Sequence, residues 1–389
     1  MKSAGANLIP TAFARHAAPR LKAVHSNVPD ATVSADAAAT ATVAKAHAQF
    51  ILPSAWLCCL TAVTSMVMVW QLDLAKEPIR LAYVSAALVI FPVALVVWGS
   101  WLLARLALAK ETNPGGAVIR EVRERTSLAV LPLLIFPLFM AAFTINKTAI
   151  PFLVGFGWDR TLMHADRSIL GVDAWQITHR FIGVRGTEFL EFFYTIAWGV
   201  ILALVVPLVA LTARPRMVGR FFLAMILTWI IGGLLVAGLF ASAGPAFTEL
   251  VDPTLARHFA PLKASLNALL RPDSLIRETQ TYLTALAHER YVIRGGGISA
   301  MPSMHIAVTA LYVYAARRTP LFVPAILFCG TIMIGSVHFG YHYLVDVIAA
   351  IVIAGLCWAA AGAWFDRNDV RGNHSMFGSC SRGNGGPNL

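Results

Sequence analysis

The chain has 389 residues, of which 58% are hydrophobic and 13% are charged. Soluble domains are about 45–50% apolar and about 25% charged, so this composition excludes a soluble monomer. The net charge of +11 does not indicate nucleic-acid binding, because the basic residues lie between long apolar segments, as membrane topology requires.

Both ends of the chain are unlike the rest of the sequence. Residues 1–48 are rich in Ala, Thr and Val with scattered charges, and they lack the compact apolar region of a cleavable signal peptide. We therefore expect a disordered N-terminal tail over 1–48. The end of the chain is rich in Gly, Ser and Asn, so we expect a second disordered tail over 367–389.

Long, uncharged apolar runs predict an all-α fold, a polytopic membrane helical bundle of about eight spans. In chain order, the runs cover 51–72, 79–108, 128–147, 189–211, 217–240, 303–316, 320–338 and 342–364. We expect two additional transmembrane helices in 49–127 and a six-helix core in 128–366. The sixth run is short for a span, so we expect it to extend before Ser303 or to lie in a thinned bilayer.

Lys and Arg in the short loops predict the orientation. With a cytoplasmic N-terminus, Arg214, Arg216, Arg220, Arg317 and Arg318 all fall on the cytoplasmic side, where such residues accumulate. We therefore predict an integral protein of the inner or plasma membrane, with both termini cytoplasmic.

This orientation brings distant polar residues to one membrane face. His305 begins the sixth run, and His342 and Asp346 begin the eighth, so all three are expected on the extracytoplasmic face. Two long loops, 146–188 and 241–302, open onto the same face. The second of these contains two amphipathic segments, 254–270 and 274–290, which we expect to form surface helices.

The first polar motif runs from Ser336 to Asp346. His342 and Asp346 are four residues apart, a spacing that places both on one face of a helix. The aspartate can then accept a hydrogen bond from one imidazole nitrogen and leave the other free as a nucleophile or base. Taken alone, the pair is equally typical of a polar helix cap at the membrane interface.

The second motif runs from Gly295 to His305. Ser303 is a good N-cap residue and follows Pro302, so a helix is expected to begin there and to offer unpaired N–H groups to an anion. The glycines 295–297 can bring further amides close. Alone, this segment is typical of an ordinary capped helix. Together, two histidines, one carboxylate and an anion-binding helix start meet the needs of phosphoryl transfer.

These motifs carry a resemblance to a known family. The sequence MPSMH at 301–305 resembles the PSxH motif of the type 2 phosphatidic acid phosphatase superfamily. Ser336 to Asp346 resembles its SRxxxxxHxxxD motif, with Ser336, His342 and Asp346 in register. The resemblance implies that His342 attacks phosphorus to form a phosphohistidine, that Asp346 orients it, and that His305 protonates the leaving oxygen. Ser303 and nearby amides would hold the phosphate.

The implied function is that of an integral membrane enzyme that hydrolyses or transfers a phosphoryl group of a lipid phosphoester. The acceptor would be water or an alcohol, and no cofactor is expected. The first motif of the superfamily, KxxxxxxRP, is absent, and Val337 stands where the third motif has arginine. The pattern is similar to the branch that includes inositol phosphorylceramide synthases, with a Gly-Pro segment at 242–247 and acidic residues at Asp159 and Asp166.

The absent motif leaves the phosphate without its usual cations. Arg294, beside the glycine loop, is our first candidate for a replacement, followed by Lys263 and Arg160. The expected phosphate-binding residues are therefore Ser303, Gly297, Arg294 and Ser336.

Two other classes compete with the phosphatase interpretation. His338, His342 and Asp346 could form a helical stripe of metal ligands, but only His305 could add a fourth ligand, so we predict no metal site. A lipid transporter or a lipid-binding pseudoenzyme could use the same residues. We find no internal repeat of the kind that transporters often show, and the polar residues gather at one face rather than at the midplane.

Overall fold

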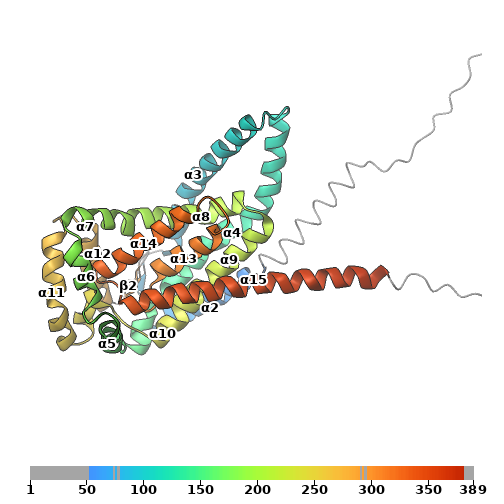
Figure 1. The fold of residues 1–389 in the computed structure, drawn as a ribbon. Coiled ribbons are helices and arrows are strands. Elements are labelled where there is room, and N and C mark those ends of the chain that lie inside the picture. Colours follow the sequence, from blue (N-terminus) through green and yellow to red (C-terminus); the bar gives the residue numbers. More distant parts are fainter. Residues whose placement is uncertain (1–51, 73–74, 77–78, 290, 293–295, 381–389) are drawn as a thin grey trace, which may run out of the picture. The chain divides into compact units, whose positions relative to one another are not determined.

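Helices form most of the described backbone, as the sequence predicts (Figure 1). The computed structural model describes residues 52–72, 75–76, 79–289, 291–292 and 296–380, all within one unit, Val43–Leu389. The predicted tail 1–48 and the last residues of the predicted tail 367–389 lie outside the described residues. The helix α15 continues to Cys380, so the second of these segments begins in helical conformation.

The helices of the first half are α2 (Leu52–Leu72), α3 (Ile79–Leu108), α4 (Pro114–Val154), α5 (Asp159–Leu170), α6 (Ala174–Phe181), α7 (Val184–Glu191) and α8 (Trp198–Thr212). Those of the second half are α9 (Pro215–Ile230), α10 (Ala237–Leu239), α11 (Pro253–Leu269), α12 (Leu275–Glu289), α13 (Met304–Ala316), α14 (Phe322–His338) and α15 (Leu344–Cys380). Two π-helical turns, Phe192–Ala197 and Ile231–Val236, continue α7 into α8 and α9 into α10.

Apolar helices of membrane-spanning length confirm the predicted bundle. Among the described residues, six helices are long and apolar enough to cross a bilayer: Leu52–Leu72, Leu81–Leu108, Pro132–Val154, Val184–Thr212, Pro215–Leu239 and Leu344–Arg367. Two shorter apolar helices, Met304–Ala316 and Phe322–His338, coincide with the sixth and seventh predicted spans. The chain is therefore an integral membrane protein.

The helix α13 is short because the chain before it is irregular rather than helical. It begins at Met304, so the predicted extension before Ser303 is wrong. Residues 296–303 form no helix, and most of them are buried. Irregular backbone is tolerated at membrane depth where protein surrounds it or where it lines a cavity.

Local sequence explains several helix ends. Asn113 caps α4 by accepting a hydrogen bond from the Gly116 N–H at 3.0 Å, and Pro114 occupies the first turn, where its missing N–H is harmless. Gly155 ends the same helix with a φ of 68°, a conformation that favours glycine.

The two long predicted loops fold into short helices that share one end of the bundle (Figure 1). The segment after α4 forms α5 and α6, and the segment before the glycine loop forms α11 and α12, which confirms the predicted helical pieces. In α11, Leu255, Phe259, Leu262 and Leu266 are buried on one helical face. These helices cover the end of the bundle that holds the motif residues.

A two-residue parallel strand pair joins the first two helices to the rest of the chain. The strand β1 (Ala75–Lys76), between α2 and α3, pairs with β2 (Tyr291–Val292), just before the glycine loop. Val292 is fully buried in a cluster with Ile145 and Ala149 of α4. The α2–α3 connection is thus attached to the segment that leads to the second motif.

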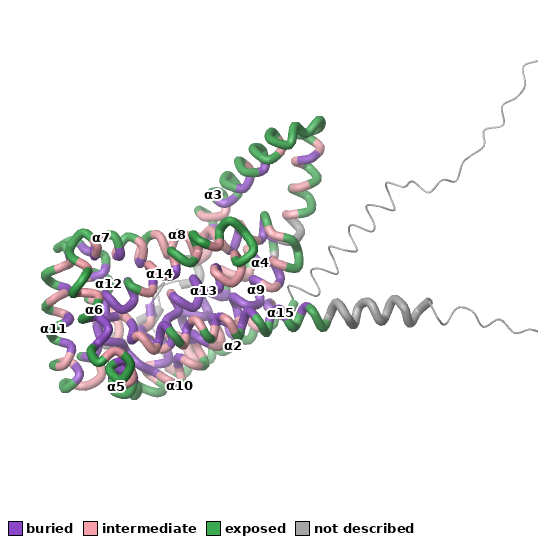
Figure 2. The backbone as a smooth tube through the Cα atoms, in the orientation of Figure 1, coloured by how far each residue is buried: buried purple, intermediate pink, exposed green. Residues whose placement is uncertain are grey.

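The opposite end of the bundle carries basic side chains in defined contacts. Arg125 donates a hydrogen bond to the Ala213 carbonyl, Arg216 pairs with Asp366, and Arg220 lies over the ring of Trp358 at 4.1 Å. The outward surface of α3 is apolar and exposed, as a lipid-facing helix requires (Figure 2).

Candidate active site

The two motif segments lie against each other where α13 and α15 begin. The Ser303 N–H donates to the Asp346 carbonyl at 3.3 Å, and His342 Nδ1 lies 2.7 Å from the Ala300 carbonyl oxygen. These contacts bring together residues that are far apart in the sequence. They place His342 and Asp346 against the start of α13, the helix whose first turn carries His305.

The hydrogen bond of His342 determines its tautomer. A carbonyl oxygen can only accept, so Nδ1 carries the proton and Nε2 keeps its lone pair. No described residue forms a hydrogen bond with this Nε2. His342 also lines a cavity at this end of the bundle.

Asp346 has a different contact from the predicted one. The helix α15 begins at Leu344, so His342 precedes the helix and does not share a helical face with Asp346. The carboxylate lies 3.8 Å from His342 Nδ1, within ion-pair range but beyond a hydrogen bond, and instead accepts the Tyr343 N–H at 2.8 Å. Asp346 thus caps the helix start, and its charge faces the protonated side of the imidazole.

His305 lies in the first turn of α13, and its imidazole stacks on two aromatic rings. The ring of Trp198 is 4.0 Å away between centroids, and that of Tyr194 is 4.5 Å away and nearly parallel. Tyr194 belongs to the π-helical turn before α8, a feature that is frequent at functional sites. The stacking holds the imidazole while leaving it at the wall of the cavity.

The cavity at this end has a volume of about 340 Å³ and brings both histidines together. Gly297, Ser299 and Tyr341 also line it. Gly297 has a φ of 88°, and a Cβ there would lie 3.1 Å from the Thr148 backbone nitrogen, so only glycine lets the loop approach α4 this closely.

Lys147 is the one cation among the described residues that line this cavity, and it is not among the sequence candidates Arg294, Lys263 and Arg160. It lies on α4, its side chain is partly buried, and it lines the cavity together with His305 and His342. No described residue accepts a hydrogen bond from its ammonium group or forms an ion pair with it. A single lysine inside an apolar helix was the available signal, because such residues are mostly functional.

The replacement cations predicted from the sequence are not among the described residues that line the cavity. Arg160 forms an ion pair with Asp252 at 2.7 Å, and Lys263 pairs with Glu249. Neither is among the residues that line the cavity. Arg294 lies outside the described residues.

The two predicted serines are fully buried and do not line the cavity. Ser303 is the N-cap residue of α13, but its hydroxyl makes no capping hydrogen bond, unlike the prediction. Ser336 closes the turn after α14, because its carbonyl accepts the N–H groups of Tyr341 and His342. Both serines therefore hold backbone segments in place.

Two buried carboxylates connect the α5 helix to the motif loops. Asp159 accepts the N–H groups of Ala243 and Gly244 at 2.9 and 2.8 Å, and Asp166 accepts those of Leu344 and Val345 at 2.7 and 3.0 Å. Burial raises the pKa of both carboxyls above its ordinary value, and the backbone hydrogen bonds act in the opposite direction.

The Gly-Pro segment at 242–247, whose N–H groups Asp159 accepts, packs tightly against the loop that carries His342. Gly244 has a φ of 93°, and a Cβ there would lie 2.4 Å from the Tyr341 carbonyl oxygen. The acidic positions and the Gly-Pro segment noted in the sequence thus fix the loop that carries His342.

His338, a member of the alternative metal-ligand stripe, makes its contacts with α6 and α7. It ends α14, its Nε2 lies 2.9 Å from the Thr187 hydroxyl, and its ring contacts that of His179 at 4.4 Å. His179 in turn contacts the His338 carbonyl and the Ser265 hydroxyl. Among the residues that the structure describes, no group of three or more His, Cys, Asp or Glu side chains is arranged to hold a metal ion.

Comparison with protein families gives one match. A family model described as the PAP2 superfamily matches residues 160–360, which is more than half of the chain and includes both motif segments. No curated protein and no solved structure matches the chain.

Proposed function

The chain belongs to the PAP2 superfamily, and from this membership we propose an enzyme that hydrolyses or transfers the phosphoryl group of a lipid phosphoester through a phosphohistidine. The observation that carries the proposal is that His342, His305 and Lys147 line one cavity at one end of an apolar bundle. A nucleophile, a proton donor and a cation are the parts that phosphoryl transfer requires.

In the first step, Nε2 of His342 attacks phosphorus while the bond between phosphorus and the lipid oxygen breaks. His305, protonated, gives its proton to that oxygen, so the leaving group departs as an alcohol. The imidazole of His342 becomes positively charged, and its Nδ1–H stays on the Ala300 carbonyl. The nearby carboxylate of Asp346 stabilises this charge.

In the second step, the oxygen of water or of an alcohol attacks the phosphohistidine. His305, now neutral, takes the proton of the acceptor, and the bond between phosphorus and nitrogen breaks. The ammonium of Lys147 and the backbone around Gly297 face the non-bridging oxygens in both steps. We assign Lys147 the charge-neutralising role for which Arg294, Lys263 and Arg160 were the sequence candidates.

Hydrolysis and transfer differ only in this acceptor. The similarity of the motifs to the inositol phosphorylceramide synthase branch favours an alcohol as the acceptor. Incubation of the purified protein with a panel of lipid phosphates and alcohols, read by mass spectrometry, separates free phosphate from a new phosphodiester.

We propose that the site faces the extracytoplasmic side and that both termini are cytoplasmic. The support is the position of Arg125, Arg216 and Arg220 at the opposite end of the bundle, because basic residues near membrane spans accumulate on the cytoplasmic side. Accessibility labelling of single cysteines in α11 and in the 213–215 loop of spheroplasts would test this orientation.

The direct test is to trap the intermediate. With a lipid carrying radiolabelled phosphate, the wild-type protein should become labelled on His342, and His342→Ala should not. His305→Ala should also lose turnover while still inserting into the membrane. A carrier or lipid-binding protein would show no label, and wild-type turnover in either variant would reject the mechanism. Chelators should have little effect, whereas strong inhibition would favour a metal enzyme.

A further inference from the structure

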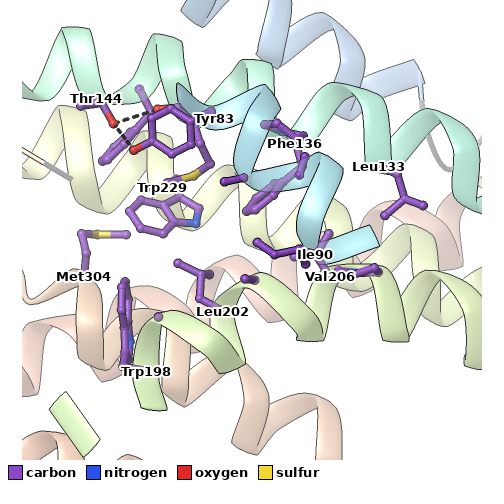
Figure 3. Close-up of a pocket in the computed structure, with 18 of the residues that line it drawn as sticks. Tyr83, Ile90, Leu133, Phe136, Thr144, Trp198, Leu202, Val206, Trp229 and Met304 are labelled. Carbon is purple, nitrogen blue, oxygen red and sulfur yellow. Dashed lines mark hydrogen bonds between the residues drawn. The ribbon is translucent and has the colours of Figure 1, made fainter. Parts of the chain in front are cut away.

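A second and larger cavity lies beside the catalytic one (Figure 3). It has a volume of about 480 Å³ and is enclosed by α3, α4, α8 and α9. Its walls are mainly aliphatic and aromatic: Tyr83, Ala86, Ala87, Ile90 and Phe91 come from α3, and Leu133, Phe136, Met140 and Phe143 come from α4. Figure 3 shows Trp229 of α9 between Tyr83 and Leu202.

The two cavities meet at the catalytic residues. Lys147, Trp198, Gly199, Met304 and His305 line both. A molecule whose polar end touches Lys147 and His305 can therefore extend directly into the apolar cavity. A phosphate joined to a hydrocarbon chain has this division into a polar and an apolar end.

The walls of the apolar cavity lie partly outside the family match. The match begins at residue 160, whereas α3 and α4 end at Leu108 and Val154. This cavity therefore depends on helices that precede the matched segment.

One buried polar group in the cavity has no partner. The indole of Trp229 is 4% exposed, and its Nε1–H finds no acceptor among the described residues. A buried donor without an acceptor is unfavourable, because it has lost its hydrogen bonds to water without a replacement. An ester or amide carbonyl near the head of a lipid chain is an acceptor of suitable chemistry. The polar hydroxyls on the neighbouring wall are already paired, since Tyr83 and Thr144 lie 2.7 Å apart.

We propose that this cavity binds the hydrocarbon chain of the lipid phosphoester whose phosphate is held at Lys147, and that α3 thereby selects the substrate chain. This inference rests on the proposed function. A hydrocarbon chain that moves from the bilayer into the cavity exchanges one apolar environment for another, so burial alone favours neither the bilayer nor the cavity. Selection must come from fit, where one methylene in a hydrophobic pocket changes specificity by about 10–200-fold.

The first experiment fills the cavity. Ala87 and Leu88 are neighbours on α3, but Ala87 is 8% exposed and lines the cavity, whereas Leu88 is 69% exposed on the outer surface. We would measure kcat/KM for a long-chain and a short-chain lysolipid phosphate. In Ala87→Trp, the ratio of kcat/KM for the long-chain substrate to kcat/KM for the short-chain substrate should fall at least about tenfold. In the matched control Leu88→Trp, it should stay at the wild-type value.

An unchanged ratio in folded, active Ala87→Trp would overturn the proposal, as would an equal fall in the Leu88→Trp control. Ala203→Phe introduces bulk from α8 and should lower the ratio in the same way if Ala87→Trp does not fold.

The second experiment does not depend on turnover. A lipid phosphate with a photoreactive group at the chain end is cross-linked to the wild-type protein and to His342→Ala, and labelled peptides are identified by mass spectrometry. Labels on the walls, at Ile90 or Leu133, support the chain site. Labels confined to the outer surface of α3 overturn it. Wall labels on a wild-type protein that turns over no lipid phosphate would keep the chain site and reject the proposed function.

Discussion

Replacing Lys147 tests the assignment of the phosphate-binding cation. Lys147→Met removes the charge and keeps a long, flexible, apolar side chain, which suits walls that include Trp198 and Met304. The variant therefore changes the electrostatics of the cavity with little change in its shape.

The size of the effect follows from the surroundings of the ammonium group. It has no acidic partner among the described residues, so its charge is available to the phosphate. Two unit charges about 4 Å apart interact by about 4 kcal/mol at an effective dielectric constant of about 20. Removing one preorganised donor from an anionic transition state typically lowers kcat by about 10²–10³. We expect kcat/KM of Lys147→Met to fall by that factor, and Lys147→Arg to recover part of it.

Stability should change in the opposite direction. A partly buried ammonium without a partner is desolvated and uncompensated, so the methionine variant should unfold at the same temperature as the wild type or at a higher one. A residue that serves only the fold would lower stability when it is replaced.

The assay uses protein purified in detergent, a lipid phosphate substrate, and phosphate or phosphodiester product as the readout, with the melting temperature measured in parallel. Lys263→Met is the matched control, because Lys263 pairs with Glu249 away from the cavity and should stay within about twofold of wild type. Near-wild-type activity of folded Lys147→Met would refute the assignment, and so would a loss of activity that accompanies unfolding.

Three further predictions concern the structure that supports the site. Asp166→Ala leaves the N–H groups of Leu344 and Val345 without an acceptor, so its melting temperature should fall by an amount equivalent to about 2–4 kcal/mol. An unchanged melting temperature would contradict the idea that Asp166 stabilises the start of α15. Gly244→Ala forces a side chain into the Tyr341 carbonyl and should lower both activity and stability, whereas Gly238→Ala, with open space around it, should do neither. Burial lowers the pKa of His179, so the unfolded chain binds its proton more readily. Stability should thus be lost as pH falls below about 6.5, with a weaker dependence in His179→Gln by thermal melts from pH 8 to 5.

Periodicity and composition were sufficient to predict the positions of the apolar spans and of the surface helices. Uncharged runs located each apolar helix, and the amphipathic pattern located α11 and α12 to within a residue or two of their bounds. These features depend on local sequence, since a helix hydrogen-bonds within itself and needs one apolar face or an apolar environment. The start of the short sixth span could not be predicted in this way, because the irregular segment before α13 is stabilised by contacts with other elements.

Long-range contacts explain what the sequence analysis missed at the site. The hydrogen bonds of Asp166 to the start of α15 join residues 178 and 179 apart, and no local pattern shows such a pairing. The spacing of His342 and Asp346 suggested a helical pair, but the helix begins between them. The predicted span 128–147 ends at Lys147, but α4 continues to Val154, and a lysine within an apolar helix is costly enough to mark a functional position.

The positions of Lys147, α3 and β1 together show why residues 160–360 are not a sufficient description of the site. The matched segment supplies His305 and His342. The cavity cation comes from α4, and the apolar cavity that meets it is closed by α3. The strand pair β1–β2 attaches the α2–α3 connection to the segment just before the glycine loop, and Gly297 of that loop packs against the backbone of α4. We infer that the catalytic unit extends into the preceding helices, which supply charge and substrate selection to a histidine pair.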